Sequence, residues 1–136
     1  MAKQKSFKIS FDFDECLNDN IHIQNLAKIL VNTDCEIFIL TSRVNDGVIS
    51  NNDLFNIAKE IGISLDNIIF VGTSNKYLAM KKHNITLHFD DNADTVDRIN
   101  RHFDSPLSTN KRAVLVNFVF EDVVNTFPIY IVIKVQ

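Results

Sequence analysis

Two aspartates close the first apolar stretch of the chain. The segment Phe11-Asp12-Phe13-Asp14 ends a run of β-prone residues, and a short polar segment follows it. Open α/β sheets carry their chemistry outside the carboxyl ends of the strands, which is where this run would place Asp12 and Asp14. Crowded carboxylates repel each other, so the pair becomes favourable once a divalent cation that prefers oxygen ligands shares the site. Taken alone, the pair also fits an ordinary acidic turn.

Later apolar runs end in polar residues as well. Thr41 and Ser42 follow the run that ends at Leu40, Lys76 comes shortly after the next run, and Asp90-Asp91 follow the fourth. Because the carboxyl ends of parallel strands lie at one edge of a sheet, we expect these groups to converge on one crevice. Acids from two strands would form an oxygen cage for Mg²⁺, and a hydroxyl with an ammonium would hold and neutralise a phosphoryl group.

The elements that must position these residues alternate along the chain. Apolar runs of strand length are separated by segments in which apolar residues recur at helical spacing. We predict strands over residues 7–13, 36–40, 67–71 and 86–89, with helices over about 21–32, 54–61, 76–83 and 93–102. This alternation predicts an α/β fold, a three-layer Rossmann-like and mostly parallel sheet.

The C-terminal part adds two more β-prone runs, residues 113–120 and 129–135. They predict a fifth strand and an antiparallel extension of the sheet. A chain of 136 residues is expected to form one domain, with a core over about residues 7–103 and a C-terminal β segment over about 112–135. The apolar last run predicts pairing with a partner, such as a second copy of the chain.

Composition excludes several classes of protein. The net charge of −3 gives no basic field, so nucleic acid is expected only as a substrate. No apolar run approaches the roughly 20 residues of a membrane span, and the polar first residues do not resemble a secretory signal. The two cysteines, Cys16 and Cys35, lack the spacing of a metal site. We therefore expect a cytoplasmic protein without a membrane partner.

The ordered motifs resemble those of the haloacid-dehalogenase (HAD) superfamily of phosphotransferases. They are Phe11–Asp14, Ile39–Arg43, Lys76 and Phe89–Asn92, within a resemblance that spans about residues 7–103. The resemblance implies a phosphatase in which Asp12 attacks phosphorus and forms an aspartyl-phosphate. Asp14 would protonate the leaving alcohol and then activate water, with its carbonyl oxygen on Mg²⁺.

The same resemblance implies roles for the other residues. Thr41 would hydrogen-bond the phosphoryl oxygens, and Lys76 would offset the negative charge of Asp12 and the phosphate. Asp91 would ligate Mg²⁺ directly, with Asp90 in support. Ser42 and Arg43 are expected to bind the substrate, and Arg43 is expected to be exposed.

The chain departs from the family pattern in two ways. Glu15-Cys16 stands where the family commonly has Gly-Thr, which removes backbone freedom at a tight turn. In addition, neither gap in which larger relatives carry a cap domain has room for one here. An uncapped site implies a large phosphorylated substrate or cover from another subunit, and the outline is similar to nucleotide phosphatases and to the phosphatase part of polynucleotide kinase-phosphatases.

Two other hypotheses remain open. The chain could be a catalytically weak HAD-fold protein whose acids still bind metal and which serves as a scaffold. It could also be a receiver-like signalling domain, which places acids at strand ends too. That domain would have a phosphoacceptor aspartate at the end of its third strand, where this chain has Val71-Gly72-Thr73.

Overall fold

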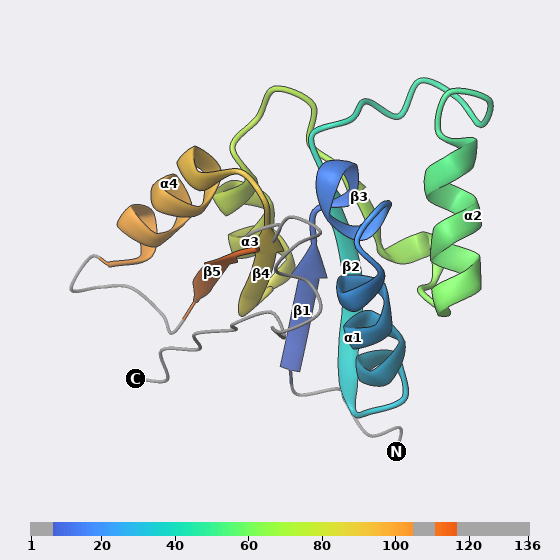
Figure 1. Cartoon of the computed structure of the whole chain (residues 1–136). Helices are drawn as coiled ribbons and strands as arrows, with labels where there is room; N and C mark the ends of the chain where they lie inside the picture. Colours follow the sequence, from blue (N-terminus) through green and yellow to red (C-terminus); the bar gives the residue numbers. More distant parts are fainter. Residues whose placement is uncertain (1–6, 105–110, 117–136) are drawn as a thin grey trace, which may run out of the picture.

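The computed structural model describes residues 7–104 and 111–116, which form an α/β fold around one parallel sheet (Figure 1). The strands, in order across the sheet, are β3 (Ile68–Phe70), β2 (Cys35–Thr41), β1 (Phe7–Phe11), β4 (Leu87–Asp90) and β5 (Arg112–Leu115). Every neighbouring pair is parallel. The predicted Rossmann-like α/β architecture is therefore confirmed, with β1 at the centre of the sheet.

Helices cover both faces of the sheet and make three layers (Figure 1). On one face lie α1 (Ile21–Val31) and α2 (Asn52–Ile61), and on the other lie α3 (Lys76–His83) and α4 (Ala93–Phe103). A short 3₁₀ helix, η2 (Leu65–Asn67), precedes β3. Right-handed crossovers of this kind bring the end of every strand to one edge of the sheet.

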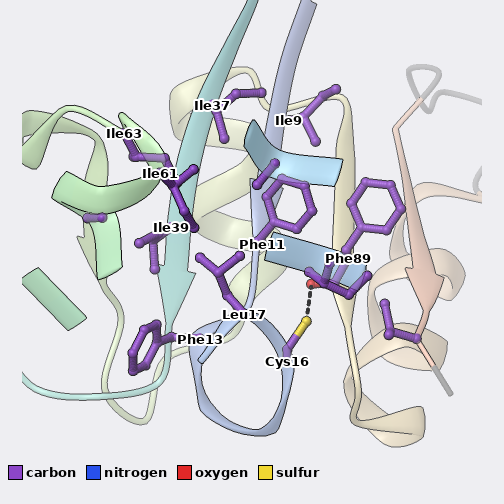
Figure 2. Packing of buried hydrophobic residues seen from close by; sticks show 14 of the residues in the cluster. Ile9, Phe11, Phe13, Cys16, Leu17, Ile37, Ile39, Ile61, Ile63 and Phe89 are labelled. Atoms are coloured by element: carbon purple, nitrogen blue, oxygen red, sulfur yellow. Dashed lines mark hydrogen bonds between the residues drawn. The ribbon is translucent and has the colours of Figure 1, made fainter. Parts of the chain in front are cut away.

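Side chains alternate between the two faces of the strands, as pleated geometry requires. Ile39 packs into the layer under α1 and α2, whereas Leu40 packs into the layer under α3 and α4. In the first layer, the rings of Phe11 and Phe89 stack with centroids 5.0 Å apart (Figure 2). Stacked rings contribute beyond their buried area, so this contact supports the β1–β4 pair that carries the acids.

Helix ends follow the capping chemistry of the sequence. The side chain of Asn20 accepts hydrogen bonds from the backbone N–H groups of His22 and Ile23, which starts α1. Gly62 ends α2 at a φ of 99°, a left-handed conformation that glycine adopts without steric cost. Asn92 caps α4 by accepting from the N–H of Thr95. Asn20 and Asn92 thus fix where α1 and α4 begin, and Gly62 fixes where α2 ends.

The predicted first strand is too long. β1 ends at Phe11, because the chain turns away into η1 (Phe13–Leu17), a wide turn that the sequence pattern did not indicate. Within η1, Glu15 has a φ of 57° and lies in the left-handed region. Cys16 is buried below the turn, with its Sγ 3.9 Å from the carbonyl oxygen of Phe89 (Figure 2).

The first C-terminal β run forms β5, which pairs in parallel with β4 and ends at Leu115. The observed strand begins at Arg112, one residue before the start of the expected strand over 113–120. The part of the expected strand beyond residue 116 lies outside the described residues. The run over 129–135 and the antiparallel extension also lie outside them. Among the described helices, none has the length and apolar character needed to cross a bilayer.

Candidate functional site

Three acids and a lysine that the strand ends predicted do meet at one edge of the sheet. The Nζ of Lys76 donates to Oδ1 of Asp12 and to Oδ2 of Asp90, each at 2.7 Å. Carboxylate oxygens of Asp12, Asp90 and Asp91 lie within 4.8 Å of one another. We call Asp12, Lys76, Asp90 and Asp91 the acidic cluster. It is assembled because β1 and β4 are parallel neighbours whose ends coincide.

Lys76 differs in position and burial from Lys81 and Lys82, the other lysines of α3. It is the first residue of α3 and is buried, whereas Lys81 and Lys82 lie in the last turn of that helix and are exposed. A buried ammonium requires acidic partners, and Asp12 and Asp90 provide them. The structure therefore places the lysine that the motif order selected in the cluster.

Asp90 is held by partners on both of its oxygens. Oδ2 accepts from Lys76 and lies 2.8 Å from Nε2 of His88, and Oδ1 accepts from the backbone N–H of Asn92 at 3.0 Å. Asp91 is less buried, and one of its carboxylate oxygens lies within 4.8 Å of an oxygen of Asp12. Asp12 and Asp91 thus have more freedom than Asp90 to turn an oxygen toward a cation.

His88 and Ser10 continue the network below the site. Ser10 Oγ lies 2.7 Å from Nδ1 of His88. Because a carboxylate only accepts, Nε2 of His88 carries the proton toward Asp90, and Nδ1 accepts from the Ser10 hydroxyl. Burial lowers the pKa of His88, which fits this neutral ring. His88 was not among the predicted site residues, although its position two residues before Asp90, on the same face of one strand, is a signal for this contact.

The order Ser10, His88, Asp90 has the composition of a nucleophilic triad. Both Ser10 and His88 have an exposed fraction of 0%. A nucleophile must reach a substrate, so this arrangement supports Asp90 from beneath and performs no chemistry of its own.

The protonation of the cluster reflects its excess of negative charge. Burial, opposed by Lys76 and reinforced by Asp90, raises the pKa of Asp12 to about 7. Burial also raises the pKa of Asp91. Burial alone would raise the pKa of Asp90 too, yet the hydrogen bond from His88 and the charge of Lys76 bring it below its usual range. One ammonium does not neutralise three carboxylates, so a further cation is favoured here.

The donor set fits a hard divalent metal ion. Carboxylate oxygens from Asp12, Asp90 and Asp91 are the ligands that Mg²⁺ and Ca²⁺ take in proteins, and no softer sulfur or imidazole donor stands among these three residues. The cluster can therefore hold such an ion.

Asp14 lies outside the acidic cluster and is bound by Arg43. Arg43 donates from Nε and Nη2 to both oxygens of Asp14, and from Nη1 and Nη2 to both oxygens of Asp53. Its guanidinium also lies 4.8 Å from the ring centroid of Phe13. Arg43 was expected to be exposed, but it is partly buried, with 23% of its side chain exposed. Asp53, in the first turn of α2, was not anticipated.

Thr41 and Ser42 lie at the end of β2. Thr41 is fully buried, and its Oγ1 accepts from the backbone N–H of Arg43 at 3.1 Å. Its O–H remains available as a donor. Ser42 is exposed and lines a cavity of about 160 Å³ together with Lys76.

Cys16 lies beneath this region and is not a nucleophile. Burial and the carboxylates of Asp12, Asp90 and Asp91 raise the pKa of its thiol above the ordinary value of 9.0. A thiol in these surroundings stays protonated and inert.

The chain matches no protein-family model and no curated protein. Its functional assignment therefore rests on the geometry of the acidic cluster and of the groups around it.

Proposed function

We propose that this protein is a Mg²⁺-dependent phosphomonoester hydrolase of the HAD type. The observation that carries the proposal is the buried ammonium of Lys76 bonded to Asp12, with Asp90 and Asp91 of the neighbouring strand end beside them. An aspartate held next to a cation at the end of a central parallel strand is suited to attack an anionic phosphoryl group.

The reaction proceeds in two displacements. In the first, an oxygen of Asp12 bonds to phosphorus and the bond from phosphorus to the substrate oxygen breaks, while Asp14 gives its proton to the departing alcohol. In the second, water attacks the aspartyl-phosphate, Asp14 takes the proton from water, and Asp12 is regenerated as inorganic phosphate leaves. Splitting the reaction in this way replaces one difficult step with two easier ones.

Other groups prepare the site for these steps. Lys76 offsets the charge of Asp12 and of the incoming phosphate. Thr41 is fully buried, so its hydroxyl must become accessible before it donates to a phosphoryl oxygen. Arg43 holds Asp14, which must exchange one of these hydrogen bonds for the leaving oxygen. Asp12, Asp91 and the Asp14 carbonyl would hold Mg²⁺, with Asp90 in support. Such an ion supplies positive charge at the phosphoryl oxygens.

The connections that follow β1 and β3 are short. Between Asp12 and α1 the chain forms only η1, and between β3 and β4 the only helix is α3. Neither connection contains a cap domain. This supports a substrate that itself covers the site, such as a nucleotide, a polynucleotide end or another large phosphorylated molecule.

The test is release of phosphate from a generic aryl phosphate with and without Mg²⁺. We expect magnesium-dependent turnover that falls by about a thousandfold or more in Asp12→Asn. Asp94→Asn, on the exposed first turn of α4, is the matched control and should keep wild-type activity. Full turnover in Asp12→Asn, with its fold verified by circular dichroism, would overturn the proposal.

A catalytically weak metal-binding scaffold is the second candidate. The hydrogen bonds from Arg43 that occupy both oxygens of Asp14 favour it, because they compete with proton transfer. Calorimetry that finds Mg²⁺ binding lost in Asp12→Asn, together with no phosphate release by the wild-type protein, would select this alternative.

A further inference from the structure

A cavity of about 160 Å³ lies beside the acidic cluster, toward the α3 and α4 side of the sheet. It is bounded by the end of β2, the connection from β3 to α3 and the first half of α4. The lining residues are Ser42, Gly72, Thr73, Ser74, Asn75, Lys76, Tyr77, Thr95, Arg98 and Ile99. Because Lys76 also bonds to Asp12, the cavity and the cluster share a wall.

The residues that line the cavity favour binding of an anionic group. The lining offers hydroxyls and a side-chain amide, and it includes the cations Lys76 and Arg98 but no carboxylate. The ammonium of Lys76 already donates hydrogen bonds to Asp12 and Asp90. Arg98 donates one hydrogen bond to Asn75 at 3.2 Å and forms no ion pair within residues 7–104 and 111–116.

Arg98 differs in this respect from other arginines of the described chain. Arg101, one turn further along α4, is paired with Asp97 at 3.0 Å, and Arg43 is paired with two aspartates. A planar guanidinium with uncommitted N–H groups is suited to bind a phosphate or carboxylate through two hydrogen bonds. Arg98 is thus the cation at this cavity that can accept a new anionic partner.

The size of the cavity limits what it can bind. Pockets that enclose a drug-sized ligand have volumes of roughly 300 Å³ or more, so this cavity takes one functional group and leaves the rest of the molecule outside. The ring of Tyr77 is stacked on His102 with centroids 4.0 Å apart, which fixes that side of the cavity before a ligand arrives.

We propose that the cavity binds a second oxyanionic group of the substrate, a phosphate or a carboxylate, and that Arg98 determines this specificity. This inference rests on the proposed phosphatase function, because the first phosphate must lie at Asp12 for the second group to reach Arg98. The preferred substrates are then phosphate esters with another anionic group a short distance away.

Phosphate release from three esters of equal backbone length tests this inference. They are butyl phosphate, the phosphate ester of hydroxybutyrate and butanediol bisphosphate, which differ in the group at the far end. Insulating methylene groups keep their leaving oxygens similar in acidity. We expect kcat/KM to be roughly tenfold or more higher for the esters with a second anionic group. The carboxylate and phosphate arms show which group is preferred.

Variants of Arg98 assign any preference to the cavity. Arg98→Ala should reduce the ratio of kcat/KM between di-anionic and simple esters by roughly tenfold, mainly through KM, and Arg98→Lys should restore part of it. Arg101→Ala removes a positive charge from the same helix and should leave the ratio unchanged. An equal loss of the ratio in Arg101→Ala would mean general charge attraction and would overturn the inference.

Binding to Asp12→Asn separates this inference from the proposed function. Calorimetry of that variant should show tighter binding of butanediol bisphosphate than of butyl phosphate, and the difference should vanish when Arg98→Ala is added. Turnover of simple esters without any preference, or binding without any difference, would overturn the second-anion site and leave the phosphatase proposal standing. A binding difference in Asp12→Asn, together with no turnover by the wild-type protein, would overturn the phosphatase proposal and keep the anion site.

Discussion

Arg43 binds Asp14 with two hydrogen bonds, from Nε at 2.9 Å and from Nη2 at 2.7 Å. The adjacent edge of the same guanidinium, formed by Nη1 and Nη2, binds Asp53 at 2.7 and 2.9 Å. Arg43 therefore connects η1, which follows β1, to the first turn of α2. This connection holds Asp14, the proposed general acid and base, in one orientation while leaving its side chain half exposed.

The Arg43–Asp53 pair should contribute measurably to stability despite its exposure. A double-mutant cycle with Arg43→Gln and Asp53→Asn is expected to give a coupling energy of about 1 kcal/mol, since bidentate geometry offsets screening by solvent. Urea denaturation measures it. The exposed Lys28–Glu60 pair, at 3.9 Å, serves as the control and should give a value near zero. Equal coupling in the two pairs would contradict this prediction.

Replacing Lys76 by methionine should destabilise the metal-free protein by about 3–5 kcal/mol, because Asp12 and Asp90 would remain buried without their cation. Mg²⁺ should restore part of this loss by supplying positive charge to the same carboxylates. Chemical denaturation with chelator and with Mg²⁺ measures both effects. Lys81→Met, at an exposed position of the same helix, should change stability little; a similar loss there would contradict the assigned role of Lys76.

Asp12 should make the metal-free protein less stable as the pH rises. The pKa of Asp12 is about 7 in the folded protein and 3.8 in its ordinary state, so the folded state binds more protons between these values. Stability then falls through this window, by on the order of a few kcal/mol, and the loss is complete above about pH 7. His88, with its lowered pKa, acts in the opposite direction.

The two contributions are separated by comparison with Asp12→Asn, which keeps His88 but cannot titrate at residue 12. Denaturation of both proteins with chelator present should show the wild-type free energy of unfolding falling relative to the variant between about pH 4 and pH 7. A constant difference across this range would refute the assignment.

Asp91→Asn should weaken Mg²⁺ binding by about tenfold or more, because it removes the carboxylate of the cluster whose oxygens are least committed to protein donors. Isothermal calorimetry measures the affinity. Asp94→Asn provides a control with the same change of charge, at an exposed position three residues away. Unchanged affinity in Asp91→Asn would remove this residue from the metal site.

Glu15→Gly should stabilise the protein by about 0.5 kcal/mol, since glycine adopts a φ of 57° without the steric cost that glutamate pays. The same replacement at Glu60, in the last turns of α2, should destabilise by about 1 kcal/mol because glycine is unfavourable inside a helix. Thermal or urea denaturation distinguishes the two signs. Loss of stability at both positions would indicate that the Glu15 side chain makes a contribution larger than the backbone strain.

The acidic cluster could be predicted because it depends on few physical rules. Apolar runs that end in Asp12 and Asp90 identify strand ends, and alternation with helices makes those strands parallel. Parallel strands then bring the two carboxylates to the same edge, and the position of Lys76 at the start of a helix brings in the ammonium. The contact itself also requires that β1 and β4 be neighbours in the sheet, and the sequence pattern does not give this strand order.

Other parts of the site depend on the path of particular segments. Asp53 reaches Arg43 because the connection after β2 brings the first turn of α2 beside Arg43, and periodicity carries no information on such a path. Likewise, β1 ends at Phe11, although Phe13 continues the apolar alternation of the strand for two more residues. Arg98 was not singled out because its role depends on the cavity that α4 forms with the β3–α3 connection.

The contact between Ser10 and His88 has a consequence for the accuracy of the site. The two residues face each other directly across β1 and β4, and both are fully buried. A slip of two residues would preserve the inside–outside alternation yet separate the Ser10 hydroxyl from Nδ1 of His88, at a cost of about 1–3 kcal/mol. This buried pair thereby favours the observed register of β1 and β4 over misaligned ones. The same register places Asp12 and Asp90 side by side at the strand ends.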